Sequence, residues 1–160
     1  MSESEVEKVW MTEKYSESTS VKELINILAE KNITKEIASE KSIQRVCDSK
    51  NSQGIIAIMS IPQYEPLKNM PDCALFLDKI IDPGNMGTLF RTAVWFGINS
   101  VFLSPGCVDP LNSKVLRSAM GAHFYLQHLM TYSHDKLFER YKKDGNAIRQ
   151  SIFEIQRQNS

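Results

Sequence analysis

Arg91 and Trp95 are two side chains whose types and spacing could together hold a nucleotide. They stand four residues apart in the run NMGTLFRTAVWFG, so a helix would place them one turn apart on the same face. A guanidinium pairs with phosphate, and an exposed indole can stack on a base or ribose. An arginine packed on a tryptophan ring is the commoner arrangement, and on local grounds alone the pair favours that packing interpretation.

The helix that carries this pair has two distinct sides. At about 100° per residue, Thr88 falls on the same side as Arg91 and Trp95. The opposite side, which we expect to pack on a sheet, collects Met86, Leu89, Phe90, Ala93, Phe96 and Gly97. The pattern therefore predicts that Arg91 points away from the core.

The turn DPGN precedes this helix. Pro83 stiffens the turn, Gly84 permits a tight conformation, and Asn85 is a candidate cap for the helix. A helix N-terminus beside a small residue, here Gly87, could let a phosphate approach bare backbone amides. The same four residues are also simply a good turn, and that interpretation is favoured locally. The dinucleotide-binding pattern GxGxxG is absent.

The second half of the chain alternates between strand and helix patterns. The segments are CALFLDKI (73–80), NMGTLFRTAVWFG (85–97), SVFLSPG (100–106), NSKVLRSAMGAHF (112–124) and YLQHLM (125–130). This alternation predicts an α/β fold with a parallel sheet covered on both faces. Such sheets bind ligands beyond the carboxyl ends of their strands, where the DPGN turn falls.

The first half predicts a smaller α/β layer, with strands at 6–13, 33–39 and 54–59, the last of them buried, and helices at 21–32 and 40–52. The first helix has an apolar stripe of Val21, Leu24, Ile25 and Leu28, with Ser20 as its candidate N-cap and Asn32 at its end. Prolines at 62, 66 and 71 mark a linker over 61–72. We therefore expect one domain at 1–60 and another at 73–160.

Composition excludes several classes of function. Nineteen basic and nineteen acidic residues balance, so no global charge attracts nucleic acid or acidic membranes. Three scattered cysteines indicate a reducing compartment, and His123, His128 and His134 lack metal-ligand spacing. No apolar run approaches the ~18 residues of a membrane span. We expect a soluble intracellular protein without a metal.

The ordered run from DKIIDPGNMGTLFRTAVWFG to KVLRSAMGAHF resembles the SpoU (TrmH-like) RNA ribose methyltransferases of the SPOUT superfamily. It is most similar to the branch that modifies large-subunit rRNA in bacteria and mitochondria. The upstream NSQGIIAIMSIP resembles the end of the family's substrate-recognition domain, which is like ribosomal protein L30e. The resemblance implies a trefoil-knotted α/β sheet and a homodimer. It also implies methyl transfer from S-adenosylmethionine to a ribose 2′-hydroxyl of RNA, in the cytoplasm or mitochondrial matrix.

The resemblance also implies roles for individual residues. It makes Arg91 the residue that activates the hydroxyl and Asn85 the residue that holds the site in shape. An arginine side chain has a pKa above about 12, so we expect Arg91 to position and polarise the hydroxyl more than deprotonate it. Lys114 and Arg117 fall in the second block of the motif and match RNA phosphate contacts. A solvated helix face explains these two cations equally well. With Arg91 and Trp95 they form the expected RNA-binding set.

The chain departs from the family pattern after residue 140. The glycine-bearing loop and the Ser-Leu-Asn loop that supply most of the methyl-donor pocket and the knot have no match, so no residue is assigned to the cofactor. Ile148, Ile152 and Ile155 instead predict a short amphipathic helix. We expect a fragment that lacks the knot segment. The alternative to an active methyltransferase is therefore a non-catalytic RNA-binding or dimerising piece.

Overall fold

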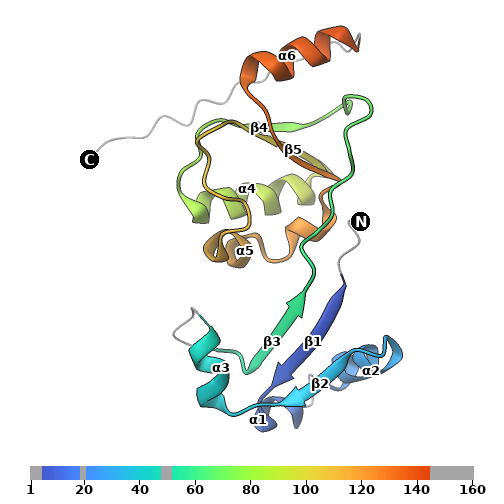
Figure 1. Cartoon of the computed structure of the whole chain (residues 1–160), viewed down its shortest axis with the longest axis vertical. Helices are drawn as coiled ribbons and strands as arrows, with labels where there is room; N and C mark the ends of the chain where they lie inside the picture. The colour runs from blue at the N-terminus through green and yellow to red at the C-terminus, as the bar shows by residue number, and fades with distance from the viewer. Residues whose placement is uncertain (1–4, 19–20, 48–51, 145–160) are drawn as a thin grey trace, which may run out of the picture. The chain divides into compact units, whose positions relative to one another are not determined.

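The computed structural model of the chain describes residues 5–18, 21–47 and 52–144. The chain divides near Tyr64 into two compact units, each described here by itself (Figure 1). Two sequence-based expectations lie outside the described residues. They are the capping role of Ser20 and the terminal helix of Ile148, Ile152 and Ile155.

The first unit is a three-stranded sheet with three helices. Along the chain the elements are β1 (Val6–Met11), α1 (Glu13–Ser16), α2 (Lys22–Glu30), β2 (Thr34–Ile37), α3 (Glu40–Val46) and β3 (Ile55–Met59). The strand order is β2-β1-β3, with β1 parallel to β2 and antiparallel to β3. The sheet of this unit is therefore mixed.

The core of the first unit lies between β1 and α2. Alternate residues of β1, Val9 and Met11, are buried beside Leu28 of α2, with Leu24 packed against them. Val21 is also buried, so the predicted apolar stripe of this helix faces the core as expected. Asn32 follows the helix with a positive φ of 54°, a conformation that asparagine tolerates better than most residues.

The prediction that 54–59 forms a buried strand is wrong in one respect. The strand β3 exists, but Ile58 and Met59 near its end are exposed. The reason is its place in the sheet: β3 is an edge strand that pairs only with β1 among the described strands. An apolar run alone cannot distinguish an edge strand from a central one.

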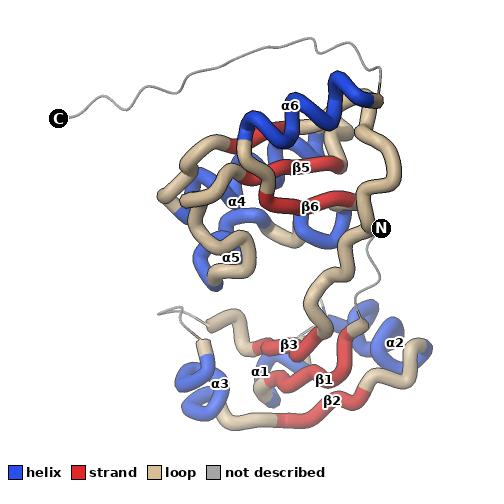
Figure 2. The backbone as a smooth tube through the Cα atoms, turned by 45° about the horizontal axis from the view of Figure 1, so that its top comes forward, coloured by secondary structure: helices blue, strands red, loops and turns tan. Residues whose placement is uncertain are grey.

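The second unit has a parallel sheet. Its elements are β4 (Leu75–Leu77), α4 (Pro83–Trp95), β5 (Ser100–Leu103), α5 (Ser113–Ala119), β6 (His128–Thr131) and α6 (His134–Lys143), and a 3-10 helix (Ala122–Tyr125) lies between α5 and β6 in the chain. The strand order is β4-β5-β6, and both pairings are parallel. Figure 2 shows β5 beside β6. The predicted α/β fold with a parallel sheet is confirmed in this unit.

Helices cover both faces of this sheet. Figure 1 shows α4 and α5 on one side and α6 on the other. On the first side α4 buries Met86, Phe90 and Ala93. On the second, Leu137 of α6 packs with Phe102 of β5. All four residues of β5 are buried, as expected of a central parallel strand.

Part of the expected linker at 61–72 belongs to the core of the second unit. The stretch contains no helix or strand, yet Leu67 and Met70 are buried in the cluster with Leu137. Arg140 of α6 donates a hydrogen bond to the carbonyl oxygen of Leu67 at 2.7 Å, and the Tyr141 hydroxyl donates to that of Pro71 at 3.1 Å. Residues 67–71 are therefore held by α6.

Candidate functional site

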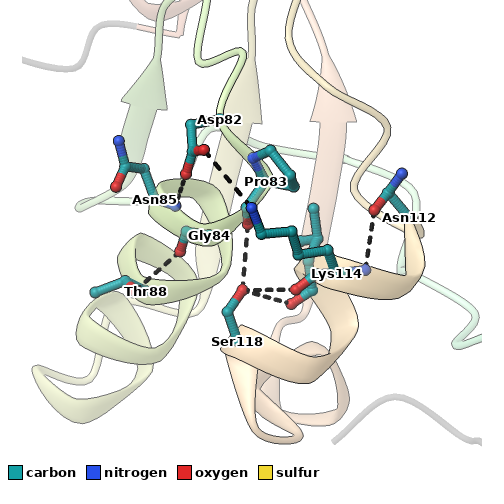
Figure 3. Close-up of polar contacts among 9 residues, drawn as sticks. Asp82, Pro83, Gly84, Asn85, Thr88, Asn112, Lys114 and Ser118 are labelled. Carbon is teal, nitrogen blue, oxygen red and sulfur yellow. Dashed lines mark hydrogen bonds and ion pairs between the residues drawn. The ribbon is translucent and has the colours of Figure 1, made fainter. Parts of the chain in front are cut away.

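The first turn of α4 is capped by Asp82, not by Asn85 as the sequence suggested. The backbone amide of Asn85 donates to Oδ1 of Asp82 at 2.7 Å (Figure 3). Pro83 occupies the first helical position, where its fixed φ suits a helix and its missing N–H costs nothing. The helix thus starts two residues before the predicted boundary. Asn85 itself is exposed, and its side chain points away from α5.

Gly87 is buried where α4 meets α5. A Cβ added there would lie 2.6 Å from the carbonyl oxygen of Val115 and 2.7 Å from the amide nitrogen of Ala119. Backbone atoms at such distances cannot give way without moving a helix. The suggestion that Gly87 lets a phosphate approach the helix is therefore wrong, because α5 occupies that space.

Polar contacts tie the start of α4 to α5. The hydroxyl of Ser118 lies 3.2 Å from the carbonyl oxygen of Pro83, and it is also within hydrogen-bond distance of the Lys114 carbonyl on its own helix (Figure 3). Nζ of Lys114 lies 4.0 Å from Oδ2 of Asp82. Because both charged side chains are largely exposed, this ion pair contributes little stability. The contact of Ser118 and the close packing at Gly87 fix the two helices together.

The helix predicted at 112–124 is interrupted at Met120. Helix α5 ends at Ala119, Met120 adopts a left-handed conformation with a φ of 49°, and Gly121 has a φ of 85°. Two successive left-handed residues cannot continue a right-handed helix. The chain then forms the short 3-10 helix that contains His123. The predicted single helix is therefore wrong, and the break exposes the Met120 side chain to solvent.

Arg91 and Trp95 lie on the exposed face of α4, as the helical pattern predicted. Trp95 is 85% exposed. Nη1 of Arg91 donates to Sδ of Met120 at 3.1 Å, so its partner is a residue of the next segment and not the neighbouring indole. The placement of Phe96 on the sheet side is wrong, because it is 75% exposed. Phe96 follows the last helical residue, where the helical pattern no longer applies.

The candidate site therefore stands on two helices. Asn85, Arg91 and Trp95 come from α4, and Lys114 and Arg117 come from α5, all with exposed side chains. Sequence reasoning named Gly87 and Arg91 but missed the residues that they meet across the helices, Ser118 and Met120. The motif contained all four, but their pairing depends on the angle between two helices.

The loops after β4 and β5 bond to one another. The amide of Ser104 donates to the Leu77 carbonyl at 2.9 Å. The Oγ of Ser104 accepts a hydrogen bond from the amide of Lys79 at 2.8 Å. The amide of Val108 donates to the Ile80 carbonyl at 2.8 Å. These contacts hold the two loops against each other. We assign none of the described residues to a methyl donor.

Two polar cavities lie in the first unit. One of about 460 Å³ is lined by Thr12, Lys14, Tyr15, Ser18, Glu40, Ile43, Gln44, Ser52, Gln53 and Gly54. The other, of about 350 Å³, shares Thr12, Lys14 and Glu40 with it. Hydroxyl, amide and charged side chains line the first cavity, whereas the second combines charged side chains with Ile37 and Ala38. No described helix is long and apolar enough to cross a membrane.

Solved structures identify the class of fold. The crystal structure of an RNA 2′-O ribose methyltransferase matches with a TM-score of 0.71 at 23% identity, covering 89% of this chain and 54% of that one. The SpoU methyltransferase AviRb from Streptomyces viridochromogenes, in complex with AdoMet, matches with a TM-score of 0.68 at 16% identity, covering 88% and 53%. The chain has the α/β fold of these RNA methyltransferases.

Family comparisons assign both units. Residues 72–157 match the SpoU rRNA Methylase family, and residues 1–65 match the RNA 2′-O ribose methyltransferase substrate binding family. The chain belongs to the SpoU rRNA methylase family. The resemblance seen in the motif around Arg91 is thereby confirmed.

Two curated relatives indicate the branch of the family. The chain is 40% identical over 103 residues to the mitochondrial rRNA methyltransferase 3 of Xenopus tropicalis, covering 60% of this chain and 25% of that protein. It is 35% identical over 114 residues to the 23S rRNA (guanosine(2553)-2′-O)-methyltransferase RlmP of Bacillus subtilis, covering 69% and 45%. The chain thus spans less than half the length of these relatives.

Proposed function

We propose that this chain acts in the 2′-O-methylation of ribose in rRNA, with S-adenosylmethionine as the methyl donor. The observation that carries the proposal is the position of Arg91, exposed on α4 within a family motif whose other parts build the helix that presents it. Asp82 starts that helix and Gly87 seats it on α5. Named rRNA methyltransferases among the relatives support rRNA as the substrate.

Arg91 would act on the ribose as a positioned cation. When bound, S-adenosylmethionine supplies a methyl group on a sulfonium sulfur, which an oxygen nucleophile can accept. A guanidinium offers five N–H donors in a fixed plane, enough to hold a phosphate and the adjacent 2′-hydroxyl together. Because arginine has a pKa above about 12, Arg91 would polarise and orient the hydroxyl rather than remove its proton. Asn85 would support this end of α4.

The remaining site residues would bind the RNA chain. Lys114 and Arg117 on α5 would contact phosphates, which fixes register without reading sequence. Trp95 offers an exposed indole on which a base can stack. The first unit matches a substrate-binding family, so its polar cavities at Thr12 and Lys14 are candidates for further RNA contacts. The first unit would then help to bind the RNA, and the second unit would carry out the methyl transfer.

Finer features of the family remain proposals for this chain. They include the homodimer, the trefoil knot, and a cytoplasmic or mitochondrial matrix location. The relatives, mitochondrial in Xenopus tropicalis and bacterial in Bacillus subtilis, support either location. No group of three His, Cys, Asp or Glu residues that could hold a metal occurs within the described ranges.

Calorimetric titration of S-adenosylmethionine into the purified chain tests the proposal. We expect S-adenosylmethionine to bind with micromolar affinity. We also expect tritiated methyl groups to be transferred to large-subunit rRNA, at positions that resist alkaline hydrolysis. If the chain bound rRNA but neither bound the donor nor transferred methyl groups, the alternative of a non-catalytic RNA-binding piece would be correct.

A further inference from the structure

Arg91 is the last of three contacts along the line where α4 packs on α5. Pro83, Gly87 and Arg91 are four residues apart in turn, so they fall on one face of the helix. The Pro83 carbonyl meets the Ser118 hydroxyl, Gly87 packs on the backbone of α5, and Arg91 reaches Met120. The packing that fixes the two helices therefore also determines where the guanidinium lies.

Met120 has an unusual conformation and environment. Its φ of 49° and ψ of 45° place it in the left-handed region, which residues with a side chain rarely adopt. Its side chain is 74% exposed, so packing in a core does not explain a large apolar residue there. Its sulfur lies 3.1 Å from Nη1 of Arg91.

The acceptor that Met120 offers is neutral and weak. A thioether sulfur accepts a hydrogen bond poorly compared with a carboxylate. Within the described part of the chain, Arg91 forms no ion pair. The guanidinium is thus held in one direction while its charge stays unneutralised, and the donors not directed at sulfur remain available to a ligand.

We propose that Met120 is a positioning residue for Arg91, holding the guanidinium at the end of α5 so that its remaining donors are directed at an RNA phosphate. The inference rests on the proposed function, since it needs RNA as the ligand of Arg91. A phosphate oxygen is a charged acceptor and forms a stronger hydrogen bond than a neutral group, so these donors bind it while the sulfur keeps its contact. A carboxylate at the same place would instead trap the arginine.

The contact itself can be tested without RNA or methyl transfer. In the full chain with ¹³C-methyl-labelled methionine, Met120→Leu identifies the resonance of the Met120 methyl group. Arg91→Ala should shift that resonance and leave the buried Met86 methyl, a control on the same helix as Arg91, in place. Adding large-subunit rRNA fragments should shift the Met120 resonance of the unmodified chain, and should shift that of Arg91→Ala less. An unchanged Met120 resonance in Arg91→Ala would overturn the contact.

Filter binding to transcribed large-subunit rRNA tests the positioning role. Met120→Leu keeps the size of the side chain but removes the acceptor, so Arg91 must be ordered when RNA binds. Binding should weaken by about two- to tenfold, the cost of ordering one long side chain. Met120→Glu should weaken it further by pairing with Arg91. In an Arg91→Ala background, Met120→Leu should have no additional effect, because the two residues act as a unit.

Several results would overturn the proposal. Additive effects of Met120→Leu and Arg91→Ala would show that Met120 acts by another route, as would normal binding by Met120→Glu. If Met120→Leu proved unstable, Met120→Gly relieves the left-handed strain and removes the same sulfur, so it should reproduce the loss of affinity. A chain that shows the methyl shift but binds no rRNA would refute the proposed function, and with it the role of Met120 in RNA binding, while leaving the contact established.

Discussion

A Cβ on Gly87 would lie 2.6 Å from the carbonyl oxygen of Val115. This spacing means that α4 and α5 meet backbone to backbone at this point, with no side chain of α4 between them. The exposed residues of the candidate site are divided between these two helices. The closeness of Gly87 and Val115 thus sets the spacing of Arg91 on one helix from Lys114 and Arg117 on the other.

Gly87→Ala should lower the free energy of unfolding by about 1–3 kcal/mol, the usual cost of overpacking. The added methyl group meets backbone atoms of α5 and must push the helices apart. Gly84→Ala is the matched control in the same helix, because its Cβ would meet side-chain atoms alone, Oδ1 of Asp82 at 3.1 Å and Cε of Lys114 at 3.9 Å. Urea denaturation compares the two variants. Equal stability of both would contradict the close packing.

Alanine substitutions at Gly54 and Gly97 distinguish two contributions to the free energy of unfolding, the strain of a positive φ and a close contact of the new Cβ. Both glycines are left-handed, at φ of 84° and 75°, so alanine at either should cost about 1–2 kcal/mol from backbone strain. At Gly54 the new Cβ would also lie 2.8 Å from Oγ1 of Thr12, whereas at Gly97 it meets nothing within 4 Å. Chemical denaturation should therefore show a larger loss for Gly54→Ala. The reverse order would refute this account of the Thr12 contact.

Tyr64 should make stability depend on pH in alkaline solution. Its hydroxyl oxygen is buried without a hydrogen-bond partner among the described residues, and burial raises its pKa from 10.0 to about 12. The protonated form is favoured in the folded state, so this contribution is complete below pH 10 and is lost as the pH rises to about 12.

Tyr64→Phe removes the unpaired hydroxyl and should be neutral or stabilising by up to about 1 kcal/mol at neutral pH. It should also flatten the loss of stability between pH 10 and about 12. Tyr125→Phe, at an exposed ring, controls for the loss of a hydroxyl. Urea midpoints across this pH range provide the measurement. A clear destabilisation by Tyr64→Phe at neutral pH would mean that the hydroxyl has a partner.

Trp95→Ala should weaken binding to rRNA without lowering stability. Stacking of one base on an aromatic ring contributes about 1–3 kcal/mol, which corresponds to roughly a five- to 150-fold loss of affinity. At 85% exposure the indole contributes little to the core. Phe96→Ala is the matched control. Phe96 is also an exposed aromatic residue, it is next in sequence, and it has no assigned role in RNA binding. If both variants bound RNA equally well, the role of Trp95 would be wrong.

Much of the second unit could be predicted from periodicity. The parallel sheet follows from the alternation of apolar strands and amphipathic helices, and the exposure of Arg91 and Trp95 follows from helical spacing. The start of α4 was predicted at Asn85, whereas the structure uses Asp82, which is an equally good capping residue. Helical spacing predicted correctly which residues within α4 share a face, but not Phe96 and Gly97, which follow its last residue and are exposed.

What sequence could not provide depends on contacts between elements. The burial of Gly87 reflects the approach of α5, and the break at Met120 reflects two left-handed residues that no periodicity reveals. Leu67 and Met70 resembled linker residues because prolines surround them, yet α6 draws them into a core. The pairing of Arg91 with Met120 joins residues 29 apart in sequence, so only the fold shows it.

The most direct test of the central claim is methyl transfer by Arg91→Ala compared with its binding of S-adenosylmethionine. Tritium transfer to large-subunit rRNA is measured for both proteins, and donor affinity is measured by calorimetry. We predict that transfer is abolished in Arg91→Ala while donor affinity stays nearly unchanged, because Arg91 acts on the ribose. Transfer that survived within a few fold of the unmodified chain would contradict the role assigned to Arg91.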